Sequence, residues 1–504
     1  MELPILYFLI PLAVFIITFI AFKGSIAKKS SVRLPPGPWK LPIIGNMHYF
    51  INCEVHHKLR DLAKIYGPVM HLQLGEISVV IISSPEAAKE VLKINDINFA
   101  QRPPVLAADI IAYGRRDLIF SPYGNYWQQL RKISITQLMN PKSVQSFSKI
   151  REEEVSNLVR LCFSRAGGTV DITREIISMI FDITTRSAFG RKMKDQKAFL
   201  DAIDEGLVLG GGFTMADMFP SFKYIDYISG ARRGLEAIHH KVDGMLNDVI
   251  NEHKSEKPAM ERDEDHKDLL DLLLEIQKNG DHEFTLSNDN IKAVIVDIFS
   301  AGSDTSATTV EWTMSELIKN PSVMAKAQAE VRNVFRMKGT VDEEGLHELK
   351  YLKAVIKESM RIHPAAALLL PRECRKSCEI FGYDIPVKTK VLVNAWAIGR
   401  DPINWSEAEK FNPERFLENE IDYKGSPNFE FIPFGAGRRI CPGIGFGIAN
   451  VELPLAHLLY HFDWKLPNGQ KNEDLEMADA FGLTVGRKNN LILVPIPHHP
   501  HSAC

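Results

Sequence analysis

The chain has 504 residues, of which 45% are hydrophobic and 24% charged, and its formal net charge at pH 7 is −3. This is the composition of a globular protein with a large core, and the near-neutral balance argues against a protein that binds nucleic acid through its overall charge. The six cysteines show no framework of regular spacing, which disfavours a disulfide scaffold and favours a reducing compartment.

The N-terminus begins with an apolar stretch, residues 3–22, that carries no charged side chain. Twenty such residues are enough to cross a bilayer as one helix. Glu2 precedes the stretch, and four basic residues follow it: Lys23, Lys28, Lys29 and Arg33. We therefore expect residues 1–22 to form a transmembrane signal anchor with the rest of the chain in the cytosol. The alternative is a cleaved signal peptide, but the basic start of such peptides is missing.

Residues 23–46 are expected to form a basic and proline-rich hinge. The segment "LPPGPWKLPIIGN" (34–46) has four prolines and two glycines, which exclude a helix. A stiff connector and a plain linker both fit this composition. Residues 47–504 then form a single large domain.

Most of that domain has helical periodicity, and strands are few. Residues 69–84 alternate like a hairpin, and Ser84 followed by Pro85 marks the start of a helix. The longest helices are expected at 144–166, 172–189, 230–253, 286–318, 321–335 and 349–362. Strands are expected at 391–395 and 491–495, and an exposed loop at 255–267. The fold class is mainly α with small β-sheets.

The helix expected at 286–318 contains "IFSAGSDTSATTVEW", which is rich in residues that form helices poorly. Small residues allow another surface to come close, and a flat macrocycle is such a surface. Gly302 and Thr305 are three residues apart and share a face.

The stretch "PFGAGRRICPGIGFG" (433–447) surrounds Cys441 with glycines and follows two arginines, Arg438 and Arg439. Cationic neighbours and the start of a helix at 445–462 are expected to lower the pKa of its thiol. Zinc would need further ligands, and neither these nor the partner of a catalytic nucleophile stand nearby. One thiolate alone suits the axial position of a haem iron.

Five residues of this stretch reproduce the spacing Phe-x-x-Gly-x-Arg-x-Cys-x-Gly of the cytochrome P-450 family: Phe434, Gly437, Arg439, Cys441 and Gly443. Together with "KESMRIHP", "FNPERF" and "LPPGP", in the family's order, the chain resembles a plant microsomal member, similar to subfamilies that oxidise terpenoids and alkaloids.

The resemblance implies the cytochrome P-450 fold, with haem b held through Cys441 as the axial iron ligand. It also implies that further residues contact the cofactor. Phe434 and Gly443 would lie beside the sulfur and Ala301 and Gly302 beside the distal haem face, while the propionates would be bound by Arg439, Trp127, Arg131 and Arg372.

Two further groups take roles from the resemblance. Asp304 and Thr305 match an acid–alcohol pair that relays protons to bound dioxygen, whereas the alternative for Thr305 is a hydrogen bond to its own helix. Glu358 and Arg361, which alone would suggest a surface ion pair, would form a buried network with Arg415.

The segments that align with the family's substrate contacts are mostly apolar and favour a lipophilic terpenoid over an alkaloid or a phenolic. They include Ile298, Ala366, Leu370, Phe481 and Leu483. Asp109 is the one candidate for a polar partner of a substrate. Three alanines at 365–367 depart from the prolines that such members often carry, so the backbone there is open to a different path.

The expected function is therefore a haem-thiolate monooxygenase of the endoplasmic reticulum membrane. It would insert one atom of O2 into a lipophilic small molecule with electrons from NADPH through a flavoprotein reductase, for which Arg438 and Lys132 are candidate docking residues. The alternatives are an alkaloid or phenolic oxidase and a reductase-independent isomerase or dehydratase.

Overall fold

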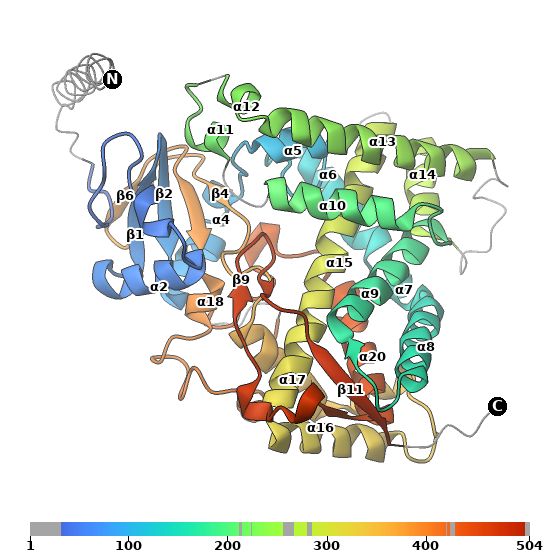
Figure 1. Ribbon diagram of the computed structural model, residues 1–504. Coiled ribbons are helices and arrows are strands. Elements are labelled where there is room, and N and C mark those ends of the chain that lie inside the picture. Colours follow the sequence, from blue (N-terminus) through green and yellow to red (C-terminus); the bar gives the residue numbers. More distant parts are fainter. Residues whose placement is uncertain are drawn as a thin grey trace, which may run out of the picture.

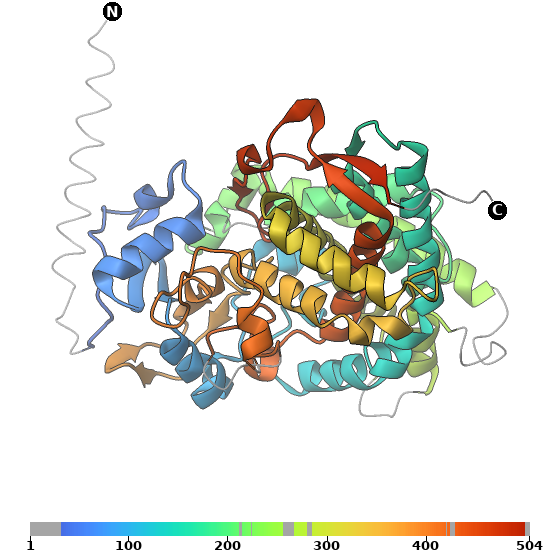
Figure 2. The same ribbon diagram turned by 90° about the horizontal axis from the view of Figure 1, so that it is seen from below.

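The computed structural model describes residues 32–210, 214–222, 224–255, 267–279, 285–419, 421–423 and 429–498. Within these residues the chain forms many helices and small sheets, as the sequence predicts (Figure 1). A sheet with α2 and α18 lies at one side, and a larger helical part surrounds the long helix α15. Figure 2 shows the two parts from below.

The helices that form the body differ widely in length. The longer ones are α2 (Val55–Tyr66), α6 (Asn125–Ile133), α8 (Ser148–Ser164), α9 (Ile172–Phe189), α10 (Gln196–Gly210), α13 (Ala231–Ser255), α14 (Leu269–Asn279), α15 (Asn288–Lys319), α16 (Pro321–Val334), α17 (Lys350–Ile362) and α20 (Ile444–His461). The shorter ones are α3 (Pro85–Lys89), α4 (Asp96–Phe99), α5 (Leu106–Ile111), α7 (Pro141–Ser146), α11 (Met215–Met218), α12 (Ile225–Ile228), α18 (Ala395–Ile398) and α19 (Arg415–Glu418).

The expected hairpin is confirmed as β1 (Val69–Leu74) and β2 (Ile77–Ile82), which pair antiparallel. It belongs to a four-stranded sheet in the order β1-β2-β7-β4, in which β7 (Lys390–Val393) runs parallel to β2 and β4 (Arg372–Glu373) forms the edge. The Ser84 side chain accepts a hydrogen bond from the Ala87 N–H, so the predicted start of α3 is also confirmed.

Helix α15 runs through the middle of the helical part (Figure 1). A capping box starts it, because the Ser287 hydroxyl and the Asn290 side chain each accept from the other's backbone N–H. It packs against α9 and α20. Residues 291–296 and 306–318 are buried, whereas residues 301–305 between them are partly or fully accessible.

The helix predicted at 144–166 is two helices, α7 and α8, so that prediction was wrong at its start. Asn140 caps α7, and Pro141 is its first residue. Phe147 separates the two helices with φ −89° and ψ 3°, and its buried ring packs edge-on against Phe446 of α20. The break therefore coincides with a tertiary contact of one buried aromatic ring.

The C-terminal part adds three small sheets. Helix α20 ends at His461, and Phe462 begins β8 (Phe462–Lys465), which pairs with β11 (Ile492–Pro497). Strand β11 also pairs with β3 (Val170–Asp171). The other two sheets are the hairpin of β9 (Asp479–Ala480) with β10 (Gly486–Arg487) and that of β5 (Cys378–Ile380) with β6 (Tyr383–Ile385).

The anchor expected at 1–22, residues 23–31 of the hinge expected at 23–46, and residues 256–266 of the loop expected at 255–267 lie outside the described residues. Among the residues that are described, no helix is both long enough and apolar enough to cross a bilayer.

Candidate active site

The loop before α20 holds Cys441 by backbone contacts. The Cys441 N–H donates to the Phe434 carbonyl oxygen over 3.1 Å, and the Gly443 N–H donates to the thiol. Gly437 has φ +72°, and a Cβ on it would lie 2.1 Å from the Leu92 carbonyl oxygen. This glycine is therefore required by a close approach of the protein's own backbone, and not by a ligand.

The sequence predicts a lowered pKa for the Cys441 thiol, and the structure contradicts this. Burial raises the thiol pKa, against the opposing effects of the Gly443 N–H and of Arg131. Neither Arg438 nor Arg439 faces the sulfur, because Arg438 pairs with Asp96 at 3.5 Å and Arg439 points to backbone carbonyls. The cation beside the thiol comes from α6, which the spacing along the chain does not indicate.

Predicted cofactor residues meet beside this loop and donate to backbone carbonyl oxygens of the loop and of distant segments. Arg439 donates to the carbonyls of Ala100 (2.8 Å) and Ser121 (2.6 Å). Arg131 donates to the Ile440 carbonyl, and Arg372 donates to the Ala436 carbonyl over 2.9 Å. The Arg439 guanidinium lies 4.1 Å from the centre of the Trp127 ring. The structure thus brings Trp127 and these three arginines together.

Arg102 is a fourth arginine at this place, and the sequence analysis missed it. It is 4% exposed and donates to the carbonyls of Leu370 and Pro371. Burial, together with the positive charges of Arg439 and Arg372, lowers its pKa. Since an arginine that follows a short loop and precedes two prolines carries no periodic pattern, only the fold reveals it.

The positive charge of these four arginines fits an anionic cofactor. Burial and the guanidinium of Arg372 lower the pKa of Arg439 to about 9, and burial lowers that of Arg372 to about 10. The acids that oppose them are Asp96 and Asp117. Burial raises the pKa of Asp117 to about 6, which is still below pH 7, so its carboxylate offsets part of the charge of the four arginines. A cofactor with two carboxylates would therefore be stabilised here.

The accessible part of α15 fits the flat face of such a cofactor. Ala301 is exposed in the middle of a buried helix, and Gly302 lies beside it. A Cβ on Gly302 would lie 3.9 Å from the Phe446 ring, and one on Gly443 would lie 4.0 Å from the Cys441 sulfur. The thiol of Cys441 is enclosed by the protein, although the residue as a whole is partly accessible. These residues fit haem with Cys441 as its ligand.

Asp304 and Thr305 do not bond to one another. The Thr305 hydroxyl donates to the Ala301 carbonyl over 2.6 Å, which is the alternative that the sequence left open. The Asp304 carboxylate is bonded to the Thr484 side chain, and burial raises its pKa. The hydroxyl of Thr305 keeps its lone pairs, so it can still accept a hydrogen bond on the accessible side of α15.

A cavity of about 250 Å³ lies beside α15, and Asp304 reaches it. Helices α9 and α10, α15 and the loop between β9 and β10 line it with mostly apolar residues: Ile177, Phe181, Leu200, Ile203, Val208, Phe299, Ser303, Asp304, Gly482, Leu483 and Thr484. Two segments expected at the substrate contribute to it, 298–305 and 481–485. The residues from α9 and α10 were missed, because their apolar periodicity is that of any core helix.

The other predicted pocket residues lie elsewhere. Ile298 is buried, and Ala366 and Leu370 are partly buried with carbonyls that bond to Leu369 and Arg102. Phe481 is 36% exposed and stacks on His56. None of these four lines the described cavity, and of the five only Leu483 does.

Asp109 does not reach the cavity either. Its side chain is 46% exposed and pairs with Arg115 at 2.7 Å. Of the alanines at 365–367, Ala365 binds the cavity loop through the backbone, because the Val485 N–H donates to its carbonyl over 2.8 Å.

Glu358, Arg361 and Arg415 form one buried group. Arg361 donates to both oxygens of Glu358 at 2.7 and 2.8 Å, and Arg415 donates to Oε1 over 3.0 Å. Arg361 also donates to the carbonyls of Gly399 and Ala408. The group joins α17 and α19 to the chain that leads to the cysteine loop.

Comparison with known proteins identifies similar chains over the whole length. The family model "Cytochrome P450" matches residues 35–494. The premnaspirodiene oxygenase of Hyoscyamus muticus is 50% identical over 96% of this chain and 96% of its own. The tabersonine 16-hydroxylase 2 of Catharanthus roseus is 51% identical over 94% of both chains. A zebra fish cytochrome P450 structure with progesterone has a TM-score of 0.75 at 25% identity, over 88% of this chain and 100% of its own.

Proposed function

This chain belongs to the cytochrome P450 family and is a monooxygenase, and on that premise we propose that it hydroxylates a lipophilic plant terpenoid with electrons from an NADPH-dependent reductase. The observation that carries the proposal is the arrangement of Cys441, the buried arginines and the accessible part of α15 around one place. Two relatives, an oxygenase at 50% identity and a hydroxylase at 51% identity, support hydroxylation as the reaction.

Haem, when bound, supplies the activation of O2, and a thiolate ligand favours cleavage of the O–O bond. Cys441 would provide that ligand. The Gly443 N–H bonds to the sulfur and so limits how much charge the sulfur donates. Arg131, Arg372 and Arg439 would hold the two propionates, and Trp127 would hold the guanidinium of Arg439 in place. Phe434 would shield the sulfur from the side of the loop.

Protons reach the distal side through α15. Thr305 already donates its own hydrogen to the helix, so it acts as an acceptor that positions a proton donor above Gly302. Asp304 keeps its proton to a higher pH than an ordinary aspartate because of burial. It supplies protons from the cavity side, where the Thr484 side chain fixes the carboxyl group.

The substrate lies in the apolar cavity between α9, α10 and α15. Its lining of Ile, Phe, Leu and Val favours a hydrocarbon skeleton. An alkaloid is the second candidate, because Asp304 gives the cavity one carboxyl group that would hydrogen-bond an amine, and a tabersonine hydroxylase is among the relatives.

The proposed anchor, hinge, catalytic domain and reductase-docking site also rest on membership of the cytochrome P450 family. Residues 1–22 anchor the enzyme in the endoplasmic reticulum membrane, residues 23–46 form the hinge, and residues 47–504 form the catalytic domain in the cytosol. The reductase docks near Arg438, whose side chain is 52% exposed.

The test combines a spectrum with turnover. The reduced protein with CO is expected to show the strongly red-shifted Soret band of a thiolate-bound haem, and NADPH with reductase is expected to yield a hydroxylated terpenoid from a panel of sesquiterpenes. Absence of the shifted band would refute the site. A normal band with turnover only of amine substrates would replace the terpenoid by an alkaloid, and product without reductase would favour an isomerase.

A further inference from the structure

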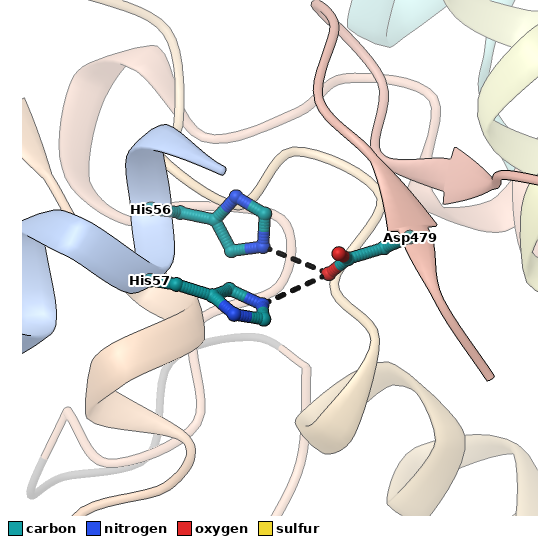
Figure 3. Close-up of side chains that lie close together, drawn as sticks. All are labelled: His56, His57 and Asp479. Carbon is teal, nitrogen blue, oxygen red and sulfur yellow. Dashed lines mark hydrogen bonds and ion pairs between the residues drawn. The ribbon is translucent and has the colours of Figure 1, made fainter. Parts of the chain in front are cut away.

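Two histidines of α2 and one aspartate of β9 meet outside the cysteine loop. The Nε2 atoms of His56 and His57 each lie 3.0 Å from the same oxygen, Oδ2 of Asp479. Figure 3 shows both rings turned toward that carboxylate from the helix. The side chain of His56 is fully buried, that of Asp479 is 13% exposed and that of His57 is 41% exposed.

This donor set is one that zinc uses in proteins, namely imidazole nitrogens with a carboxylate oxygen. The three ligand atoms lie within 4.8 Å of one another. In a tetrahedral site with bonds of about 2.0–2.2 Å, ligand atoms stand about 3.3–3.5 Å apart. The two histidine–aspartate distances of 3.0 Å would need to open by only a few tenths of an ångström, and the two histidine nitrogens lie within 4.8 Å of each other. We propose that His56, His57 and Asp479 bind a divalent transition metal, Zn²⁺ above all, with water at the fourth position on the exposed side of His57.

The rings are held in this orientation by aromatic packing. His57 stacks on Trp396 with 4.2 Å between ring centres, and His56 meets the same ring edge-on at 4.9 Å. Phe481 stacks on His56 from the cavity loop. Such packing reduces the entropy that the ligands lose when they bind an ion.

The charges around the three residues are close to balanced. Arg60 and Arg400 lie over Trp396, and both bind Glu409, at 2.8 and 3.1 Å. Arg60 also lies 3.7 Å from Asp61. The positive charge of Arg400 disfavours a further cation here, and Glu409 offsets that charge.

The affinity is expected to be moderate, because Nδ1 of His56 is buried without a hydrogen-bond partner. Ligating histidines normally donate from the second nitrogen to an outer partner, which strengthens the metal bond. The bound ion would fix β9 to α2 at the base of the loop that carries Leu483 and Thr484 into the cavity.

The experiment is a titration of the full-length haem-loaded protein with Zn²⁺ in competition with a chromophoric chelator. The wild type is expected to bind one more equivalent than Asp479→Asn or His57→Ala, with at least a ~100-fold loss of affinity at this site in both variants. His240→Ala removes an exposed histidine elsewhere and serves as the matched control, with binding equal to the wild type. The C-terminal His498, His499 and His501 remain in every variant, so their contribution cancels.

Folding of each variant is checked by the CO spectrum and circular dichroism. Asp479→Asn keeps an oxygen that can accept a hydrogen bond, so it separates loss of a ligand from loss of the contact between α2 and β9. Equal zinc binding by the wild type and by folded variants would overturn the proposal. A zinc X-ray absorption spectrum of the wild type without imidazole scattering would overturn it independently, even if a variant fails to fold.

Discussion

The cysteine side and the cavity side of α15 are built in different ways. On the cysteine side, buried arginines donate to backbone carbonyls of distant segments, as Arg439 does at Ala100 and Ser121 and Arg372 at Ala436. On the cavity side, apolar side chains from α9, α10 and the β9–β10 loop surround one carboxyl group. On the cysteine side, hydrogen bonds fix the positions of the arginines and of the segments that they bind. On the cavity side, the apolar side chains determine only the volume and the polarity of the cavity. We infer that the chemistry depends on the first side and the choice of substrate on the second.

The largest effect is expected from removal of the proposed thiolate ligand of haem. Cys441→Ser should abolish product formation and the red-shifted CO band, because a hydroxyl does not replace the thiolate. Both are measured on the purified protein. Cys53→Ser changes a thiol that bonds to the Tyr49 carbonyl and should keep both signals. A Cys441→Ser variant that retains the shifted band would refute the assignment.

The buried network on the cysteine side should show the largest effect on stability. Glu358→Gln leaves Arg361 and Arg415 buried without their countercharge, and we expect a loss of about 3–5 kcal/mol in the free energy of unfolding. The urea concentration that halves the haem-bound form measures it. Glu407→Gln breaks an exposed pair with Lys410 and should cost at most about 1 kcal/mol. Equal losses in the two variants would contradict the role of the network.

Thr305 lies where the two sides meet. Thr305→Ala should lower the product formed per NADPH by about 10²-fold while NADPH oxidation continues, because proton delivery is lost and reduction is not. Thr309→Ala removes a hydroxyl that also donates to its own helix one turn later and is the matched control. If both variants form as much product per NADPH as the wild type, Thr305 has no role in proton delivery.

Asp304 makes the cavity side sensitive to pH. Burial raises its pKa, so it remains protonated above the usual value near 4, and in its proposed role it would deliver protons until the pH rises through the raised pKa. Product per NADPH should fall over that range in the wild type, by up to about 10-fold per pH unit, and should stay level in Asp304→Asn. Thr484→Val removes a bond that favours the charged form, which should move the fall to higher pH. An identical pH profile in all three proteins would exclude this role.

The smallest effect is expected from a change of cavity volume. Leu483→Phe should weaken binding of a preferred terpenoid by about 10-fold and alter which carbon is oxidised, with the CO band unchanged. Spin-state titrations measure the binding. Leu417→Phe adds the same ring at a site that is 49% exposed and should leave binding as it is. A changed CO band with unchanged substrate binding would mean that Leu483 on the cavity side affects the cysteine side, which would contradict separate roles for the two sides.

The sequence predicts regular elements and the cysteine loop well, because both depend on local patterns. Helix α9 has the predicted bounds, and Ser84 caps α3 as expected. The break at Phe147 coincides with a contact to a ring from α20, and Arg102 acts through carbonyls near residue 370. Contacts of this kind join segments far apart in the chain, so spacing alone does not reveal them.

The error in the pKa predicted for the Cys441 thiol has the same origin. Adjacent positive residues suggested a lowered pKa for Cys441, but the side chains of Arg438 and Arg439 turn away and burial dominates. Asp304 and Thr305 are neighbours in sequence, and yet successive helix residues point in different directions, so one meets Thr484 and the other its own helix. The roles of these residues stay predictions until the variants above are measured.

The parallel pairing of β2 with β7 has a consequence for synthesis on the ribosome. Residues 79–82 bond to residues 390–393, so the N-terminal hairpin emerges early and must wait for its third strand. At about 5–20 residues per second, the intervening chain takes roughly 15–60 s to translate. During that time the edge of β2 is open to other chains. Early protection of the nascent hairpin is therefore a condition for the yield of folded enzyme.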